Sequence, residues 1–450
     1  MDPVLEKIYA IKKSEIPEYA RHLMLGGGTR GGPVLVRGKG CWVEDIDGKK
    51  YIDCTSQSWA LYLGYANDQI NSIVSEHLKS LSHVHQGFDT LSRFALARKL
   101  AELAPKGLDR VSFTVGGGPA VEAAMKIAIK NRPGAQEFLC LYDSYHGTTL
   151  GTMGGSWQST LAGGKLMAPA SYNRLTKQFI RVPNPYCYRC PLGQKPESCG
   201  MLCLTVLRST IERGVNGPVA GIVIEPLQAS GGQVIFPKEY LQGVRDICDE
   251  FGIVMIYDEI QTYARIGTFF SSEYYGVPPD IIVLGKGLGA GFPIGAIIIR
   301  DTLEGFSPDT EELHTFANST VAQVAAMKLI DLLENGVLDN CRAMGERIGN
   351  GLREMQKEFP AIGEVRQAGL HIGVELVKDP ASRAPDPELY AAIRKKGFEN
   401  GIIFGLGGTA KNVLKIKPPL IVSKDEADTI LQLFRKSLRA ALEGTAPLRG

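Results

Sequence analysis

The feature of this sequence that most constrains the fold is a series of short apolar runs that alternate with helical stretches. The runs cover residues 137–143, 220–227, 252–260, 280–286 and 295–300. Because they lack polar alternation, they are typical of strands that are covered on both faces. Residues 239–252 lie between two of the runs and have the periodicity of an amphipathic crossover helix. The alternation therefore predicts an α/β fold with a mostly parallel sheet.

The pattern changes after about residue 320. Two long helices are predicted there, then two strand-like segments (370–377 and 413–422) and a final helix. Near the start, residues 41–54 predict a hairpin around Asp47-Gly48, a strong turn dipeptide. We expect three units: an N-terminal segment over residues 1–75, a large domain over 76–320 and a smaller α+β C-terminal domain over 321–450.

Charge and composition exclude several classes of partner and location. The 50 basic and 48 acidic residues give a net charge of +2, which provides no long-range field for nucleic acid or an anionic membrane. No apolar run approaches the ~18 residues of a membrane span, and the first twenty residues have mixed charge without the apolar core of a signal peptide. Nine cysteines in 450 residues are too sparse for a disulfide scaffold. These features predict a cytoplasmic protein.

Two ionisable residues stand at the ends of strand-like runs. Lys286 is followed by a glycine-rich loop, and a partly desolvated lysine has a lowered pKa and can form a Schiff base. Asp258 ends another run, and a carboxylate in that place can keep the nitrogen of a bound pyridine ring protonated. Ligands bind at such strand ends in α/β sheets. The alternatives are a solvated surface lysine and a structural strand-end carboxylate.

Two further motifs follow strand-like segments. Gly116, Gly117 and Gly118 predict a turn, with Pro119 at the first position of the helix that follows. Such a turn presents backbone N–H groups to an anion, although a simple turn and cap would need the same residues. The motif Tyr145-His146-Gly147 offers an aromatic ring that either stacks on a ligand or packs in the core.

The stretch from Asp258 to Ala296 resembles the signature of the class III (ornithine/GABA-type, fold-type I) aminotransferases, which use pyridoxal 5′-phosphate (PLP). Further similarity lies in the glycine turn, in Tyr145-His146-Gly147 and in residues 38–54, 224–232, 314–316 and 415–422. The resemblance implies a large PLP-binding domain with a mostly parallel seven-stranded sheet. It also implies a homodimer, or a dimer of dimers, with shared active sites.

The resemblance implies roles for individual residues. Lys286 is expected to form the Schiff base and to move the proton, and Asp258 to pair with the pyridine nitrogen. Gln261 is expected to donate a hydrogen bond to the 3′-oxygen of the ring. Gly117 and Gly118 are expected to bind the cofactor phosphate through their backbone N–H groups.

Four more residues are implied as cofactor contacts. Tyr145 is the expected stacking ring, and His146 lies beside it. Glu225 matches a glutamate that lies near the cofactor in the family. Thr315 is the expected phosphate contact that the neighbouring subunit supplies.

The departures from the family pattern concern the substrate. Ornithine and GABA enzymes pair a glutamate with an arginine that grips the α-carboxylate. Ser230 stands at the position of the glutamate and Lys415 at that of the arginine. Lysine gives a point charge instead of a bidentate fork, so the anionic end of the substrate is held differently or is a different anion. Trp59 and Tyr62 stand where family members often line the substrate pocket, and core packing is the alternative for both.

A group of cysteines has metal-ligand spacing. Cys187, Cys190, Cys199 and Cys203 have the pattern C-x2-C-x8-C-x3-C. Four thiolates can hold zinc or an iron–sulfur cluster. Reduced thiols in a packed loop and a disulfide are the alternatives, and the resemblance to cysteine-containing inserts in part of the family favours reduced thiols.

We expect an aminotransferase that moves an amino group from an amine or amino acid donor to a 2-oxo acid. An amino acid racemase or epimerase is the first alternative, because the same cofactor chemistry has several outcomes. A phospholyase is the second, because residues 415–419 also resemble the amino-alcohol-phosphate branch of the family. A PLP-binding protein without activity is a third possibility of a different class.

Overall fold

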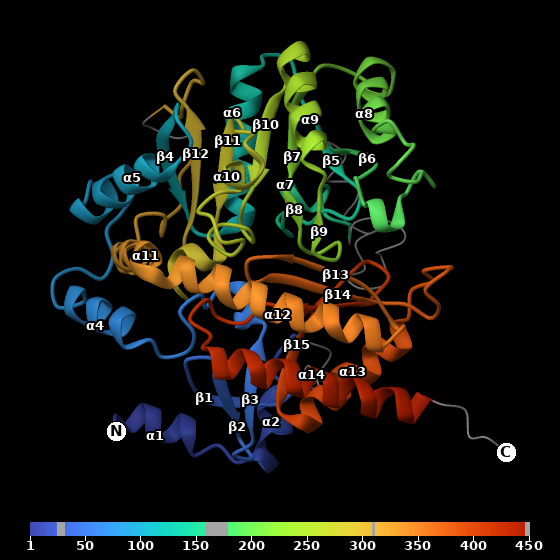
Figure 1. Cartoon of the computed structure of the whole chain (residues 1–450). Helices are drawn as coiled ribbons and strands as arrows, with labels where there is room; N and C mark the ends of the chain where they lie inside the picture. Colours follow the sequence, from blue (N-terminus) through green and yellow to red (C-terminus); the bar gives the residue numbers. More distant parts are fainter. Residues whose placement is uncertain (25–31, 158–178, 308–310, 446–450) are drawn as a thin grey trace.

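The computed structural model describes residues 1–24, 32–157, 179–307 and 311–445. Two seven-stranded sheets form its framework, one above the other in Figure 1. The larger unit contains most of residues 108–300, whereas the second sheet joins strands from both ends of the chain.

The first sheet has the strand order β4-β12-β11-β10-β7-β5-β6. Its strands are β4 (Leu108–Thr114), β5 (Glu137–Leu141), β6 (Phe179–Val182), β7 (Val219–Ile224), β10 (Val254–Asp258), β11 (Ile281–Leu284) and β12 (Gly295–Arg300). The pairs β10–β11, β10–β7, β5–β7 and β5–β6 are parallel, and only β12 runs against its neighbours β11 and β4. The mostly parallel seven-stranded sheet is therefore confirmed.

Helices cover both faces of this sheet, which explains why its strands are continuously apolar. Helix α6 (Gly117–Asn131) packs on one face against alternate residues such as Phe138, Val223 and Ile256. Helices α8 (Leu202–Arg213) and α9 (Lys238–Phe251) cover the other face, where Leu139, Ile222 and Met255 point. Each strand thus buries both sets of side chains, and its hydrophobic run lacks the polar alternation of a half-exposed strand.

The second sheet has the order β1-β2-β3-β15-β16-β14-β13. Its strands are β1 (Leu35–Lys39), β2 (Trp42–Asp45), β3 (Lys50–Cys54), β13 (Ile362–Ala368), β14 (His371–Leu376), β15 (Ile402–Gly407) and β16 (Val413–Ile416). Strands β2 and β3 form the predicted hairpin, in which Gly48 takes the left-handed conformation. Parallel pairing of β3 with β15 makes the N-terminal hairpin part of the C-terminal sheet. The predicted unit boundaries at residues 75 and 320 stay predictions.

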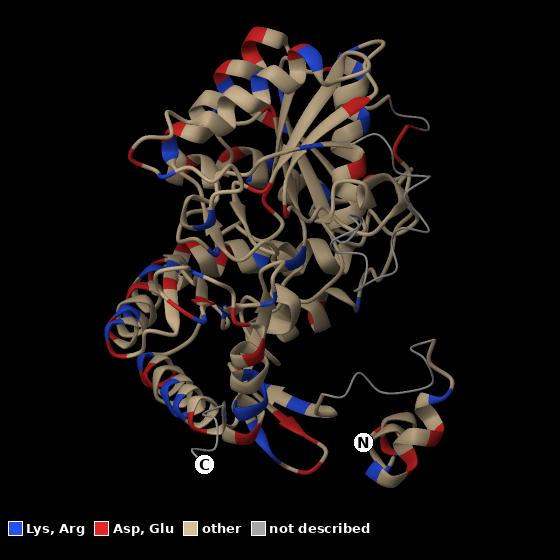
Figure 2. Ribbon diagram, turned by 90° about the vertical axis from the view of Figure 1, so that its right-hand side faces the viewer, with Lys and Arg blue, Asp and Glu red and all other residues tan. Residues whose placement is uncertain are grey.

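The remaining elements lie around the two sheets, with α12 running across the front of the molecule in Figure 1. They are α1 (Pro3–Tyr9), α2 (Ile16–Ala20), the turn α3 (Ser56–Trp59), α4 (Asp68–His77), α5 (Leu91–Leu103), α7 (Leu150–Met153), β8 (Leu227–Gln228), β9 (Val234–Ile235), α10 (Ser271–Tyr275), α11 (Thr320–Leu332), α12 (Leu338–Glu358), α13 (Pro387–Asn400) and α14 (Lys424–Thr445). Helix α1 buries no side chain and stands away from the main body in Figure 2. No helix among the described residues has the length and apolar character to cross a membrane.

One local prediction was wrong. Pro119 is the third residue of α6 and not the first, because the helix begins at Gly117. The two glycines therefore form the first helical turn instead of a separate loop. Proline is tolerated there because the first N–H groups of a helix have no partner within the helix.

Candidate active site

Four predicted residues meet at one edge of the large sheet. Glu225 directly follows β7, Asp258 ends β10, Lys286 lies just past β11 and Tyr145 follows β5. Since these strands are parallel, their carboxyl ends lie at the same edge. A cavity of 280 Å³ opens there. Its lining includes Gly117, Gly118, Tyr145, His146, Glu225, Asp258, Gln261 and Lys286.

Asp258 is buried and held in a fixed orientation. One carboxylate oxygen accepts a hydrogen bond from the backbone N–H of Ile260 at 3.1 Å, and the other lies 2.8 Å from Nδ1 of His146. Nε2 of His146 is buried and has no hydrogen-bond partner among the described residues. The histidine therefore keeps its ring against Asp258, and the carboxylate keeps acceptor capacity for a group in the cavity.

Glu225 is a second buried carboxylate at this edge. Its two oxygens accept backbone hydrogen bonds from Tyr145 and Ala229, both at 2.9 Å. Burial raises the pKa of Glu225, whereas the nearby His146 opposes that rise. The side chain ties the loop after β5 to the loop after β7, and so it fixes the position of Tyr145.

Lys286 lies within electrostatic range of both carboxylates. Burial lowers the pKa of its amine, and the charges of Asp258 and Glu225 partly restore it. Its backbone has φ +42°, a left-handed conformation that is uncommon for a residue with a side chain. Strained residues of this kind concentrate at functional sites. A lysine with a lowered pKa, at a strand end inside a cavity, is suited to act as a nucleophile and base.

The glycine turn forms a narrow cradle at the start of α6. Gly116 caps this helix without a side-chain hydrogen bond. A β-carbon at Gly117 would lie 2.6 Å from Cδ1 of Ile260, and one at Gly285 would lie 3.2 Å from Cα of Gly117. The absence of side chains at these positions lets the backbone approach closely and leaves the first N–H groups of the helix for an anion.

Lys415 lies on β16, where burial lowers the pKa of its amine to about 7. Glu225 raises this pKa and Lys286 lowers it, so all three residues lie within electrostatic range of one another. Nζ of Lys415 is 4.6 Å from the ring centroid of Trp59. No ion pair of Lys415 is formed with any of the described residues.

The turn that carries Trp59 has an unusual backbone. Ser56, Gln57, Ser58 and Trp59 all have positive φ, between 44° and 67°. Left-handed residues cost roughly 1–2 kcal/mol each. The side chain of Ser56 fastens the turn, because it donates a 2.7 Å hydrogen bond to the carbonyl of Lys417. This turn places the Trp59 ring against the amines of Lys415 and Lys417.

Lys417 is a site residue that the sequence reasoning missed. It is fully buried, 4.7 Å from the Trp59 ring centroid, and its Nζ donates a 3.3 Å hydrogen bond to Oε1 of Gln261. The sequence did contain a signal that pointed to Lys417. Residues two apart on a strand point to the same face, so Lys415 on that face implied Lys417.

Four predicted residues do not line this cavity, namely Trp59 and Lys415, described above, and Tyr62 and Thr315. Tyr62 is fully buried, bonds the carbonyl of Tyr263 at 2.8 Å and packs against Gly287. The structure therefore favours its core-packing interpretation. Thr315 is exposed beside Phe316, whose ring lies 4.9 Å from that of His83.

The residues present fit PLP. The cavity offers amide donors for a phosphate, an oriented carboxylate for a ring nitrogen and an amine for a carbonyl carbon. The unpartnered Nε2 of His146 and the glycine cradle are further features that a bound group would explain. Sites of this kind combine a shaped cavity with a few convergent polar groups.

The cysteine group forms no disulfide. All nine cysteines are free thiols, including Cys187, Cys190, Cys199 and Cys203. Over the described ranges, no three His, Cys, Asp or Glu side chains are arranged to hold a metal ion. The segment is joined to the second sheet, because Arg189 donates to Glu375 at 2.6 Å and Tyr186 also hydrogen-bonds that carboxylate.

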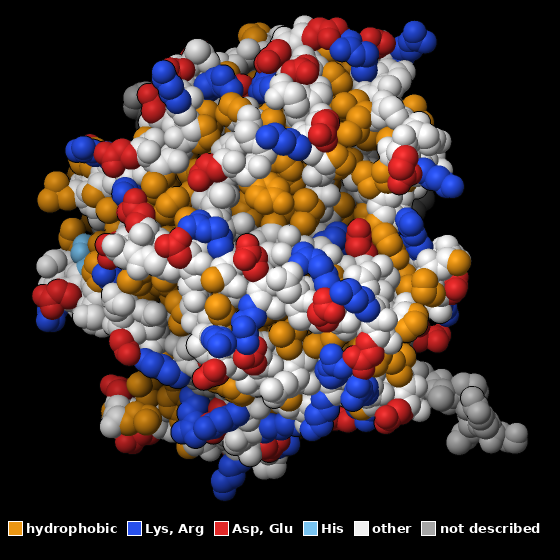
Figure 3. Space-filling view, in the orientation of Figure 1, with side chains coloured by type: hydrophobic (Ala, Val, Ile, Leu, Met, Phe, Trp, Pro, Cys, Tyr) orange, Lys and Arg blue, Asp and Glu red, His pale blue; other side chains and the backbone are white. Residues whose placement is uncertain are grey.

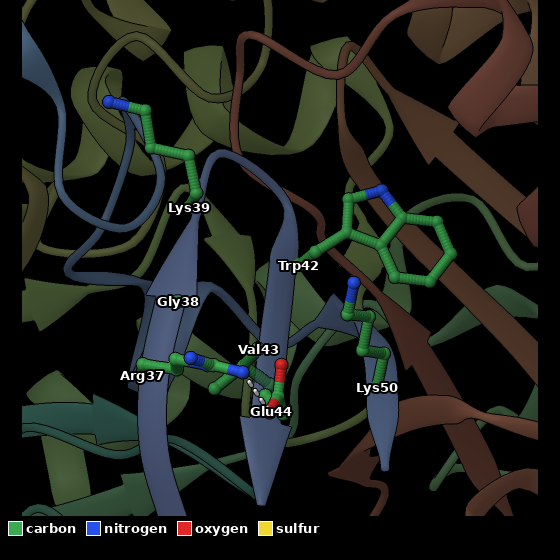
Figure 4. A pocket seen from close by; sticks show the side chains of 7 residues that line it. All are labelled: Arg37, Gly38, Lys39, Trp42, Val43, Glu44 and Lys50. Carbon is green, nitrogen blue, oxygen red and sulfur yellow. Dashed lines mark hydrogen bonds and ion pairs between the residues drawn. The ribbon is translucent and has the colours of Figure 1, made fainter. Parts of the chain in front are cut away.

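A second hollow of 650 Å³ lies on the face of β1, β2 and β3 (Figure 4) and contains none of the predicted site residues. Two of its cations are already paired, Arg37 with Glu44 at 2.5 Å and Lys39 with Asp68 at 2.6 Å. Trp42 and Lys50 point into it side by side. Its two lysines are exposed to solvent and it holds no buried acid–base pair, so the strand-end cavity remains the candidate active site.

Comparison with known proteins agrees with this geometry. The family model described as "Aminotransferase class-III" matches residues 30–438. The adenosylmethionine-8-amino-7-oxononanoate aminotransferase of Geobacter sulfurreducens is 33% identical, over 91% of this chain and 93% of its own. The leucine/methionine racemase of Thermococcus litoralis is 32% identical, over 96% and 97%. A Pseudomonas jessenii omega transaminase solved with PMP is 26% identical, with a TM-score of 0.85 over 96% of this chain and 99% of that one.

Proposed function

Since the chain belongs to the class III aminotransferase family and is a PLP-dependent aminotransferase, we propose that its amino donors carry an anionic group that Lys415 binds. A 2-oxo acid accepts the amino group in the second half of the reaction. The observation that carries the proposal is Lys415, a buried amine next to the cavity with no ion pair to a described residue.

We infer the following division of roles for the cofactor site. When bound, PLP supplies an electron sink for the charge that develops when the donor loses its proton. Lys286 bonds the cofactor and moves the proton, which its place in the same cavity as Asp258 and Glu225 and its lowered pKa support. Asp258, oriented by His146, keeps the ring nitrogen protonated, and the N–H groups of Gly117 and Gly118 bind the phosphate.

The anionic group of the donor supplies the charge that Lys415 lacks. Within a buried site an unpaired ammonium is costly, and a bound carboxylate or phosphate compensates that cost. Family members with a glutamate at the position of Ser230 can withdraw their cation by pairing it. Ser230 cannot form such a pair, so Lys415 stays available to every anionic donor.

Lys415→Met tests the proposal through its effect on two donors, one with and one without an anionic group. We expect KM for the anionic donor to rise about tenfold or more, with a much smaller change for the uncharged amine. Lys50→Met, at a cation of the distant hollow, is the matched control and should change neither KM. Equal effects of Lys415→Met on both donors would contradict the proposal.

A racemase activity is the second candidate, because the relative from Thermococcus litoralis carries that name. The purified protein mixed with donor and no oxo acid separates the two. Conversion of the cofactor to its amine form, one per site, supports amino transfer. Retention of the cofactor with loss of optical rotation supports racemisation, and release of phosphate from an amino-alcohol phosphate supports elimination.

We also infer a homodimer with shared active sites. Seven large apolar side chains are exposed on α4, α5 and the segments beside them, and we call this group the α4–α5 surface. Its members are Leu78, Leu81, Phe88, Leu91, Phe94, Leu313 and Phe316. Monomers rarely expose so many apolar side chains on neighbouring elements. Thr315 belongs to the same region, so a second copy seated there would receive it as a phosphate contact.

The surface charge and the free thiols support two further expectations, one about nucleic acid as a partner and one about location. Acidic and basic side chains are interspersed on the face in Figure 3, which supports the expectation that nucleic acid is not a partner. All nine cysteines are free, which supports a cytoplasmic location.

A further inference from the structure

The contact between Lys417 and Gln261 determines which end of the glutamine amide faces the cavity. An amide carries an acceptor oxygen and a donor nitrogen, and a lysine ammonium only donates. The hydrogen bond from Nζ of Lys417 to Oε1 of Gln261 therefore turns Nε2 away from the lysine. Gln261 lines the cavity, and its Nε2 has no hydrogen-bond partner among the described residues.

Lys417 itself is fixed from several sides. Its backbone N–H donates to the carbonyl of Cys54 at 2.9 Å, and its carbonyl accepts from Ser56. The ring of Trp59 covers its ammonium at 4.7 Å. Its Nζ hydrogen-bonds Gln261, and none of the ion pairs among the described residues includes Lys417. Gln261 is thus the side-chain oxygen to which its charge is directed.

We infer that Lys417 is a positioning residue that holds Gln261 as a hydrogen-bond donor toward the 3′-oxygen of the cofactor ring. The inference rests on the proposed placement of PLP in this cavity. Without Lys417 the amide could rotate and present its oxygen, which would face the cofactor oxygen as a second acceptor. Lys417 acts through Gln261 and does not touch the reacting atoms.

Lys415 provides a matched control for the loss of a nearby charge. Both lysines lie over Trp59, but only Lys417 bonds Gln261. The other charged or titratable groups around Lys417 are Arg265, Lys286, Glu225 and His371. They remain in both single variants, so a difference between Lys417→Met and Lys415→Met reports the hydrogen bond.

The experiment measures PLP binding to the cofactor-free protein and the pH midpoint of the visible absorption of bound PLP. We expect Lys417→Met to weaken PLP binding about fivefold and to raise the midpoint, since loss of a donor leaves the oxygen more electron density to hold the nearby proton. Lys415→Met should change both quantities less. In a Gln261→Ala background, Lys417→Met should have no larger effect than Lys415→Met.

Additive effects of Lys417→Met and Gln261→Ala would overturn the inference, as would equal shifts in the two lysine variants. Thermal unfolding shows whether each variant is folded.

If Lys417→Met does not fold, Gln261→Glu replaces it. A carboxylate paired with Lys417 offers the cofactor oxygen only acceptors, so Gln261→Glu should bind PLP more weakly than Gln261→Ala, and the reverse order would overturn the inference. Failure of the parent to bind PLP would instead contradict the proposed function.

Discussion

At the scale of single residues, the site is defined by amines whose charge is costly to bury. Burial lowers the pKa of Lys286, Lys415 and Lys417 below the usual lysine value. The three have different partners, namely two carboxylates near Lys286, the Trp59 ring for Lys415, and that ring with Gln261 for Lys417. These differences are the basis on which we propose separate roles for the three lysines, in the covalent bond, in binding the substrate anion and in positioning Gln261.

The pKa of Lys415, about 7, predicts a pH dependence for anionic donors. Its ammonium is present below that pH and is lost as the pH rises through it. We therefore expect KM for an anionic donor to rise above about pH 7, with a slope that Lys415→Met removes. The measurement is KM against pH for both proteins. A profile that keeps its slope in Lys415→Met would assign the titration to another group.

Asp258→Asn should retain the cofactor and lower kcat about 100-fold or more, because an amide cannot hold the ring nitrogen protonated. Glu259→Gln is the control, since Glu259 is equally buried but bonds Thr262 and Ser271 instead of facing the cavity. Its kcat per folded site should stay close to that of the parent. Near-parental kcat in Asp258→Asn would rule out the role of the carboxylate.

At the scale of elements, β15 makes room for the side chain of Lys415. A β-carbon at Gly407 would lie 2.5 Å from Cε of Lys415. Gly407→Ala should therefore displace this amine and raise KM for anionic donors about fivefold, with less effect on uncharged ones. Gly217→Ala, at a glycine with open space around it, is the control. Unchanged selectivity in Gly407→Ala would show that the Lys415 position is not critical.

The elements that the sequence predicted are those with strong local signals. The runs at β5, β7, β10, β11 and β12 are buried on both faces, and periodicity alone indicates them. Strand β4 was missed because its sequence, LDRVSFT, mixes exposed charge with apolar residues at the sheet edge. The pairing of β3 with β15 joins residues about 350 positions apart, and no local pattern encodes such a contact.

The site residues also divide into those with a signal in the sequence and those that depend on tertiary contacts. Lys286 and Asp258 were predicted because strand ends are visible in the sequence, whereas Glu225 was predicted from the family resemblance. The structure brings all three to one cavity. The burial of Tyr62 and the left-handed turn at Trp59 depend on tertiary packing, which the sequence pattern does not show. The resemblance predicted Gln261 as a donor but not the residue that orients it, because that partner, Lys417, lies 156 residues away.

At the scale of the whole molecule, the proposed homodimer places the exposed Thr315 of one copy at the site of the other. We expect Lys286→Ala and Thr315→Asp each to have low activity as pure proteins. When the two are unfolded and refolded together, about a quarter of the sites should combine an intact Lys286 with an intact Thr315 of the other chain. Activity recovered on mixing, above the sum of the separate proteins, checks this. No recovery, despite dimers by light scattering, would contradict shared sites.

The proposed chemistry depends on Lys286 being the lysine that bonds PLP. Borohydride reduction of the PLP-loaded protein fixes the covalent link, and peptide mapping identifies the residue that carries it. We expect the label on Lys286, with Lys286→Ala folded and unlabelled. A label on Lys415 or Lys417, the two other buried amines beside this cavity, would contradict it.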